Sequence, residues 1–224
     1  MSTDPTQESF VDTSLAPPVR GFLHRPPSDA SATVVLTHGA GGNAKSALLI
    51  ALAENFAAHG FNVLRCDLPF RQTRPFGPPR PSDAARDREG LRNAVTAVRN
   101  LAARVFLGGQ SYGGRQATML CAESPDLSDG LLLLSYPLHA PGKPDQPRIQ
   151  HLPKLQIPSL FVHGTRDPFG SIEEMHSALK LIPSRTELIP VEGAGHDLGF
   201  KGKAKNEGLP NKVTEAFRRF FDTP

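Results

Sequence analysis

Hydrophobic positions along the chain gather into short, nearly continuous runs, separated by segments in which apolar residues recur at helical spacing. The runs are 33–39 (TVVLTHG), 61–67 (FNVLRCD), 104–109 (RVFLGG), 130–137 (GLLLLSYP), 158–164 (PSLFVHG) and 186–191 (TELIPV). They are rich in leucine or β-branched residues and do not alternate with polar ones, which is typical of strands buried on both faces. The pattern therefore predicts a parallel sheet.

The segments between these runs carry one apolar face each and predict helices within 45–59, 83–102, 171–181 and 211–221. Gly60 stands where a left-handed C-terminal cap is expected, and Ser171 with Glu174 has the spacing of a capping box. Strand and helix alternate along the chain. This order predicts an α/β fold with a mostly parallel, doubly wound sheet flanked by helices.

The ends and loops indicate one domain. Residues 1–18 predict a loose N-terminal arm, followed by an edge strand near 19–24, and residues 19–224 predict a single domain. Two proline-rich loops cover 67–82 and 137–157. The second is long enough for a small lid but too short for a separate cap domain.

Composition narrows the class only a little. Glycine (20) and proline (22) are too few to indicate disorder, and the net charge of +3 comes from interleaved bases and acids, so nucleic-acid binding is not required. Cys66 and Cys121 lie in apolar surroundings and are expected to be buried, unpaired side chains. No apolar stretch approaches the roughly 18 residues of a membrane span, and residues 1–20 lack the apolar centre of a signal peptide. The expectation is a cytoplasmic protein without a membrane partner.

The segment after the third run carries the pattern G-x-S-x-G, from Gly109 through Ser111 to Gly113. In an open parallel sheet, ligands bind beyond the carboxyl ends of the strands. A sharp strand-to-helix turn exposes a serine oxygen above the sheet, and the helix that begins near Tyr112 directs its positive end at a developing anion. The alternative is a phosphate-binding or packing turn, but the Walker lysine and the G-x-G-x-x-G motif are absent. Ser111 is therefore the candidate nucleophile.

Candidate partners follow three other runs. Asp167 comes directly after the fifth run, where a carboxylate can orient an imidazole; the alternative is a turn aspartate before proline. His196 lies in a Gly-Ala-Gly-His loop after the sixth run, a placement suited to a general base. After the first run, His38 precedes Gly39-Ala40-Gly41-Gly42, whose amides can approach a ligand, and His38 is expected to orient this loop by hydrogen bonding. The other histidines are expected in surface or loop positions: His24, His59, His139, His151, His163 and His176.

With the chain order Ser111, Asp167, His196, the sequence resembles the α/β-hydrolase superfamily from about residue 19 to 221. It is similar to the compact, lidless branch near dienelactone hydrolases and small bacterial hydrolases, and to a subunit of the nonspecific-lethal chromatin complex. Dienelactone hydrolases carry a cysteine nucleophile, so Ser111 argues against dienelactone as the substrate. The resemblance implies no metal or organic cofactor.

The resemblance also implies residue roles. Ser111 attacks a carbonyl carbon, His196 accepts the serine proton and later protonates the leaving group, and Asp167 orients His196. The amides of Tyr112 and Ala40 form the oxyanion hole. From the residues alone, Gly41 remains an alternative to Ala40, and Asp145 an alternative acid to Asp167.

Arg71 and Arg74 follow the second run at the same edge of the sheet. Because guanidinium groups bind carboxylate or phosphate through two parallel hydrogen bonds, one hypothesis is that either residue contacts an acidic group of the substrate. The alternative is a solvated loop charge, or a partner for Asp67 or Asp83.

These features together predict a serine hydrolase that cleaves a small ester, thioester or related acyl substrate through an acyl-enzyme, with that small molecule as its partner. Two alternatives stay open. One is a scaffold or interaction module that keeps the fold without turnover. The other is a peptidase, C–C hydrolase or perhydrolase, since the same residues serve several leaving groups.

Overall fold

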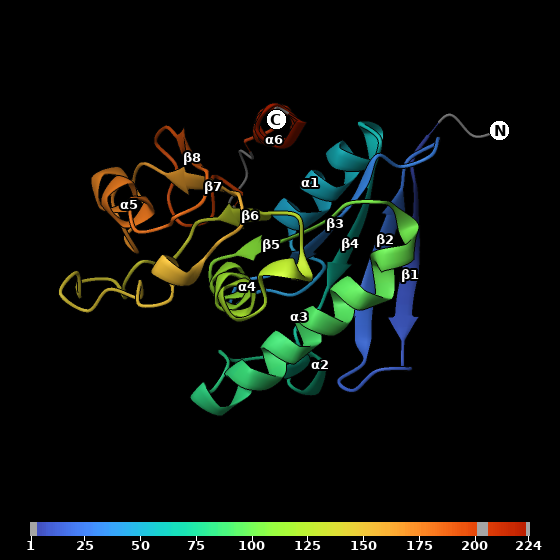
Figure 1. Cartoon of the computed structure of the whole chain (residues 1–224), viewed down its shortest axis with the longest axis horizontal. Helices are drawn as coiled ribbons and strands as arrows, with labels where there is room; N and C mark the ends of the chain where they lie inside the picture. Colours follow the sequence, from blue (N-terminus) through green and yellow to red (C-terminus); the bar gives the residue numbers. More distant parts are fainter. Residues whose placement is uncertain (1–3, 201–205, 223–224) are drawn as a thin grey trace.

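The structure, a computed structural model, describes residues 4–200 and 206–222. These residues form an eight-stranded sheet in the order β1-β2-β4-β3-β5-β6-β7-β8 (Figure 1). The strands are β1 (Thr6–Asp12), β2 (Val19–Arg25), β3 (Ala32–Thr37), β4 (Phe61–Cys66), β5 (Val105–Gln110), β6 (Leu131–Leu134), β7 (Ser159–Gly164) and β8 (Thr186–Val191). All pairs from β4 to β8 are parallel, whereas β1 and β2 run antiparallel to their neighbours. The predicted mostly parallel sheet is confirmed.

Helices cover both faces of the sheet (Figure 1). They are α1 (Ala47–Ala58), α2 (Pro69–Thr73), α3 (Ala84–Val98), α4 (Tyr112–Glu123), α5 (Ile172–Leu179) and α6 (Leu209–Asp222). One apolar core lies between the sheet and α1 with α6, and the other between the sheet and α3, α4 and α5. Because both faces are covered, β3, β4, β6 and β7 are buried along their whole length, as their continuous apolar runs predict.

The structure also confirms several local features that the sequence predicts. Ser171 and Glu174 form the predicted capping box at the start of α5. Gly60 has a φ of +88° directly after α1, the left-handed conformation expected there. Cys66 and Cys121 are buried free thiols, and burial raises their pKa to about 12 and about 11. The loop 137–157 contains only one short 3-10 turn, Leu152–Lys154, and builds no cap domain.

The N-terminal segment differs from the loose arm that the sequence predicts. Thr6–Asp12 is strand β1, paired with β2 along its full length, so the loose arm expected over residues 1–18 is wrong for this segment. Residues 1–3 lie outside the described residues. The strand expected near 19–24 is β2, but β1 covers its outer edge. The side chains of β1 are mostly exposed, so the strand has no buried apolar stripe that a pattern could reveal.

Two histidines also differ from expectation. His24 in β2 and His163 in β7 are buried strand residues, whereas His139, although buried, lies in a loop as expected. Each ring has a polar partner, which makes its burial tolerable: Arg65 donates to His24, and His163 donates to the carbonyl of Gly170.

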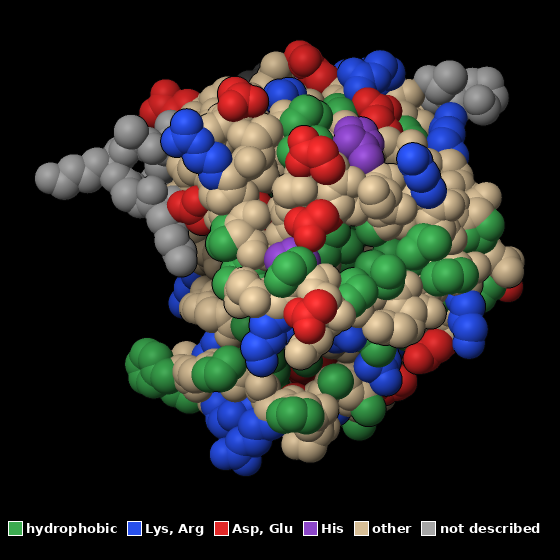
Figure 2. All heavy atoms as spheres, turned by 90° about the vertical axis from the view of Figure 1, so that its left-hand side faces the viewer, with side chains coloured by type: hydrophobic (Ala, Val, Ile, Leu, Met, Phe, Trp, Pro, Cys, Tyr) green, Lys and Arg blue, Asp and Glu red, His purple; other side chains and the backbone are tan. Residues whose placement is uncertain are grey.

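Within the described ranges, no helix is both long and apolar enough to cross a membrane. On the face that carries α5 and the loop 137–157, acidic, basic and hydrophobic side chains are interspersed (Figure 2). That face shows no broad area of a single charge.

Candidate active site

Ser111 occupies a sharp turn between β5 and α4. Its φ of +50° and ψ of −115° are rare for a residue with a side chain and mark a strained backbone. The Ser111 amide donates to the carbonyl of Leu134 at 2.8 Å, which holds the turn against β6. The predicted strand, turn and helix around Ser111 are therefore present.

Glycines let the end of β3 approach this turn closely. A Cβ atom at Gly113 would lie 2.5 Å from the carbonyl oxygen of His38, and one at Gly109 would lie 2.9 Å from Cγ2 of Thr37. Neither space admits a side chain. The two glycines thus place Ser111 beside the loop 39–42, at the point between β3 and β5 where the strand order reverses direction.

Ser111, His196 and Asp167 form one chain of hydrogen bonds. Nε2 of His196 lies 2.8 Å from Oγ of Ser111, and Nδ1 lies 2.8 Å from Oδ2 of Asp167. Because a carboxylate only accepts, Nδ1 carries the proton and Nε2 is left to accept from the serine hydroxyl. The three residues follow β5, β8 and β7, so the sheet brings together positions far apart in the sequence.

The aspartate and the imidazole are held from several sides. The side chain of Asp167 is fully buried, and its Oδ1 accepts the amide of Phe169 at 2.9 Å. The ring of Phe169 stacks on His196 with 4.1 Å between the centroids. A Cβ atom at Gly164 would lie 2.3 Å from the carbonyl oxygen of Ala194, so the loop that carries His196 packs directly on the end of β7.

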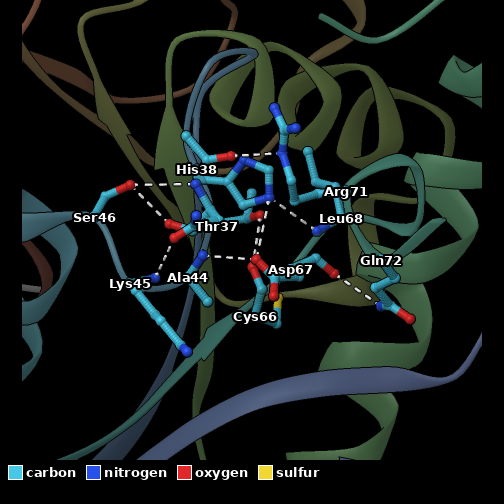
Figure 3. A network of polar contacts seen from close by, with 12 residues as sticks. Thr37, His38, Ala44, Lys45, Ser46, Cys66, Asp67, Leu68, Arg71 and Gln72 are labelled. Atoms are coloured by element: carbon cyan, nitrogen blue, oxygen red, sulfur yellow. Dashed lines mark hydrogen bonds and ion pairs between the residues drawn. The ribbon is translucent and has the colours of Figure 1, made fainter. Parts of the chain in front are cut away.

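The loop 39–42 is fastened by His38, as the sequence predicts (Figure 3). Nδ1 of His38 donates to the carbonyl of Gly39 at 2.8 Å, and Nε2 accepts the amide of Leu68 at 3.1 Å. Burial lowers the pKa of His38 and keeps the ring neutral, as both contacts require. Asp67 accepts the amide of Ala44 at 2.7 Å and so ties the same loop region to the end of β4.

These elements surround an open cavity of about 900 Å³. Ser111, His196, Ala40, Gly41 and Tyr112 all line it. The amide of Tyr112 is the first of α4 and has no acceptor within its own helix. The cavity is therefore lined by a serine hydroxyl, an imidazole and the backbone amides of two glycine-rich turns.

The profile described as alpha/beta hydrolase domain matches residues 30–221. The chain belongs to this alpha/beta hydrolase family.

This alpha/beta hydrolase is 29% identical over 177 residues to cutinase est2 of Thermobifida alba, and the match covers 76% of this chain and 54% of the relative. The chain thus spans about half the length of that curated protein.

Similar solved structures include dienelactone hydrolase of Anabaena variabilis, with a TM-score of 0.75, 20% identity and 98% of both chains covered. Est1E of Butyrivibrio proteoclasticus has a TM-score of 0.75 at 16% identity, covering 96% of this chain and 99% of its own. XC6422 of Xanthomonas campestris, described as an a/b serine hydrolase without lid, has a TM-score of 0.68 at 17% identity, covering 98% and 96%. At these identities the likeness concerns the fold.

Arg71 and Arg74 are placed differently from the hypothesis that one of them contacts substrate. Neither is among the residues that line the cavity. Arg71 is buried and donates to the carbonyls of Ala40, Gly42, Arg74 and Gly77 at 2.8–3.1 Å. Arg74 forms an ion pair with Asp83, one of the alternatives that the sequence left open. The guanidinium of Arg71 is thus engaged by the backbone and braces the loop that carries Ala40.

Other residues that line the cavity of this alpha/beta hydrolase were not predicted from the sequence. Arg115, Arg148 and the exposed Arg80 line it, together with Asp197. Arg115 follows Ser111 by four residues, one helical turn, and that spacing is the signal that points to it. Asp145 is exposed in the loop 137–157, whereas Asp167 occupies the position next to His196. Among the described residues, no group of His, Cys, Asp or Glu side chains is arranged to hold a metal ion.

Proposed function

We propose that this alpha/beta hydrolase is a serine hydrolase that cleaves a small ester, or a related thioester, through an acyl-enzyme. The observation that carries the proposal is the continuous hydrogen-bond chain from Asp167 through His196 to Ser111, which ends in an open cavity. The relative named cutinase supports ester bonds as the target.

The reaction begins when Oγ of Ser111 attacks the carbonyl carbon of the substrate while Nε2 of His196 takes the hydroxyl proton. The carbonyl oxygen becomes an oxyanion and accepts hydrogen bonds from the amides of Tyr112 and Ala40. Collapse of this intermediate breaks the ester bond, and His196 returns the proton to the departing alcohol. Water then repeats the sequence on the acyl-enzyme and releases the acid.

Asp167 serves this cycle without exchanging a proton. Its buried carboxylate keeps the proton of His196 on Nδ1, so that Nε2 faces Ser111, and it stabilises the imidazolium that forms during attack. His163 lies 3.7 Å from the same carboxylate, and burial lowers its pKa, so it stays neutral and leaves His196 as the cationic partner.

Hydrolysis of short p-nitrophenyl esters by purified variants tests the proposal. Ser111→Ala, and to a similar degree His196→Gln, should lower kcat by about 10⁶-fold, and Asp167→Asn by about 10⁴-fold. Ser135→Ala is the matched control, because Ser135 also follows a strand with a φ of +50° but does not line the cavity. Hydrolysis at wild-type rate by Ser111→Ala would refute the assignment. A folded wild-type protein that hydrolyses no ester or thioester would favour the scaffold alternative.

A further inference from the structure

Two arginines of the cavity come from separate parts of the chain. Arg115 lies in the first turn of α4, one turn beyond Ser111, and Arg148 lies in the loop 137–157. Both line the cavity that contains Ser111 and His196. Long side chains on a helix lean toward its N-terminus, which directs Arg115 back over the turn that carries Ser111.

Neither guanidinium has a partner in the part of the chain that the structure describes. No hydrogen bond or ion pair joins the side chain of Arg115 or Arg148 to another described residue, and Nε of Arg115 is buried without an acceptor. Arginine is normally paired when it leaves water, because an unpaired buried donor costs free energy. Arg115 thus has one buried donor that the described chain leaves unpaired, and the partly exposed guanidinium of Arg148 lines the same cavity, so both can bind an acceptor supplied from outside the chain.

The charges in the cavity are also unbalanced. Burial and then the like charge of Arg115 lower the pKa of Arg148, so the two cations lie close enough to repel each other. Asp197 is the sole acidic residue among the described residues that line this cavity, and it follows His196 directly in the sequence. An anion between Arg115 and Arg148 would relieve both the repulsion and the missing hydrogen bonds.

We propose that Arg115 and Arg148 form a subsite for an oxyanion group, a carboxylate or a phosphate, carried by the acyl substrate at a few bonds from the carbonyl that Ser111 attacks. The inference rests on the proposed function and specifies its substrate class. Guanidinium groups fit both kinds of anion through pairs of parallel hydrogen bonds. Because Arg115 follows Ser111 by four residues and lines the same cavity, the anionic group is expected within a few bonds of the reacting carbonyl.

The first experiment compares methyl valerate with monomethyl glutarate, in which a carboxylate replaces the terminal methyl group of the acyl chain. Acid release is followed by titration at constant pH. The wild type should prefer the glutarate ester in kcat/KM by about 10-fold or more, mainly through KM. Arg115→Gln and Arg148→Gln should each lower the ratio of the two kcat/KM values by about 10 to 100-fold.

Two further variants control for charge and for geometry. Arg86 is exposed on α3 and does not line the cavity, so Arg86→Gln removes the same charge elsewhere and should leave the ratio unchanged. Arg115→Lys keeps the charge without the planar fork and should retain part of the preference. An unchanged ratio in both Arg115→Gln and Arg148→Gln, with thermal unfolding like that of the wild type, would overturn the subsite.

Binding of product-like acids separates the two anions. Valerate, glutarate and 4-phosphonobutyrate share one chain and differ only in the terminal methyl, carboxylate or phosphonate group. Titration calorimetry on Ser111→Ala protein measures their binding without turnover. Tighter binding of glutarate supports a carboxylate, tighter binding of 4-phosphonobutyrate supports a phosphate, and equal binding of all three contradicts the proposal.

The failures of the two proposals are distinguishable. Hydrolysis of methyl valerate that depends on Ser111, without any preference for the glutarate ester, would reject the subsite and leave the hydrolase. Loss of both esterase activity and covalent labelling of Ser111 would reject the hydrolase, while the calorimetric comparison would still report on the two arginines.

Discussion

Two pairs of arginines in this molecule differ in where their guanidinium groups find hydrogen-bond acceptors. Arg65 and Arg71 are 1% and 8% exposed, yet their guanidinium groups donate to several acceptors within the chain. Arg115 and Arg148 are only half buried and have no acceptor among the described residues. The first pair shapes the scaffold, and the second faces the cavity. Whether an arginine near the reaction site is structural or available to substrate therefore depends on whether its guanidinium has acceptors within the chain, and not on its distance from the nucleophile.

The scaffold pair connects segments that the sheet alone does not join. Nε of Arg65 donates to His24 at 2.9 Å, and Nη2 donates to Gln7 at 3.0 Å, which links β4 to β2 and β1. Arg65 also donates to the carbonyl of Ala44, ahead of α1. Arg71 performs the corresponding task for the loop that carries Ala40.

Arg71→Ala should produce the largest change within this comparison. Removing the side chain leaves four carbonyls without their charged donor, so the free energy of unfolding should fall by about 3–5 kcal/mol. The loop with Ala40 would lose its brace, and kcat for ester hydrolysis should fall by about 100-fold. Urea unfolding and steady-state kinetics measure the two effects. A variant within about 1 kcal/mol of the wild type at full kcat would show that Arg71 braces nothing.

The contact between Arg65 and His24 should make stability depend on pH. Burial, and secondly the charge of Arg65, lower the pKa of His24 to about 4. The unfolded chain therefore binds this proton at a higher pH than the folded one. The free energy of unfolding is therefore highest above about pH 6.5 and falls by roughly 3 kcal/mol through His24 as the pH falls toward 4.

His24→Gln isolates this contribution, because its amide oxygen still accepts from Arg65 but does not titrate. Urea unfolding between pH 4.5 and 7.5 should show a shallower slope for the variant. Burial also lowers the pKa of His38 and His163, so part of the wild-type slope should remain. Identical slopes would mean that His24 is not held neutral by its surroundings.

Arg115→Gln should affect stability far less than Arg71→Ala. It breaks no hydrogen bond or ion pair among the described residues and removes a like charge beside Arg148, so the free energy of unfolding should change by about 1 kcal/mol or less. Thermal unfolding at low ionic strength is the measurement. A loss above about 2 kcal/mol would place Arg115 with the scaffold arginines and against the proposed subsite.

Arg74→Ala should have the smallest effect. Its ion pair with Asp83 joins side chains that are 28% and 25% exposed, and such pairs contribute about 0.5 kcal/mol in water. Stability should decrease by roughly that amount, and ester kinetics should match the wild type. A kcat reduced as strongly as in Arg71→Ala would show that the ion pair of Arg74 with Asp83 is needed to hold the loop 74–83, which contributes Arg80 to the cavity, in its place.

Much of the fold can be predicted from local patterns in the amino-acid sequence. The continuous apolar runs predict β3 to β8, and β3 to β7 are buried almost throughout because both faces of the sheet are covered there, whereas the edge strand β8 is only partly buried. Ser111 is predictable because its strained turn needs glycine at fixed offsets, and His196 because a Gly-Ala-Gly-His segment cannot continue a strand or a helix. These signals depend on a few adjacent residues.

The remaining features depend on contacts between distant segments. β1 has an exposed pattern and is held by its pairing with β2, which no local window reveals. Arg71 donates to backbone carbonyl groups. Because every residue has a backbone carbonyl, the sequence does not reveal which residues accept these hydrogen bonds. The role of Arg148 depends on the path of the loop 137–157, whereas the spacing of Arg115 from Ser111 could have been read directly.

The proposed function requires Ser111 to be the activated nucleophile of the cavity. Intact-protein mass spectrometry after treatment with a fluorophosphonate, with peptide mapping to locate the adduct, is the sharpest measurement of this role. We expect one adduct on Ser111 in the wild type and in Ser135→Ala, much slower labelling in His196→Gln, and none in Ser111→Ala. A folded wild-type protein that gains no adduct, or equal labelling of Ser111→Ala, would contradict this role.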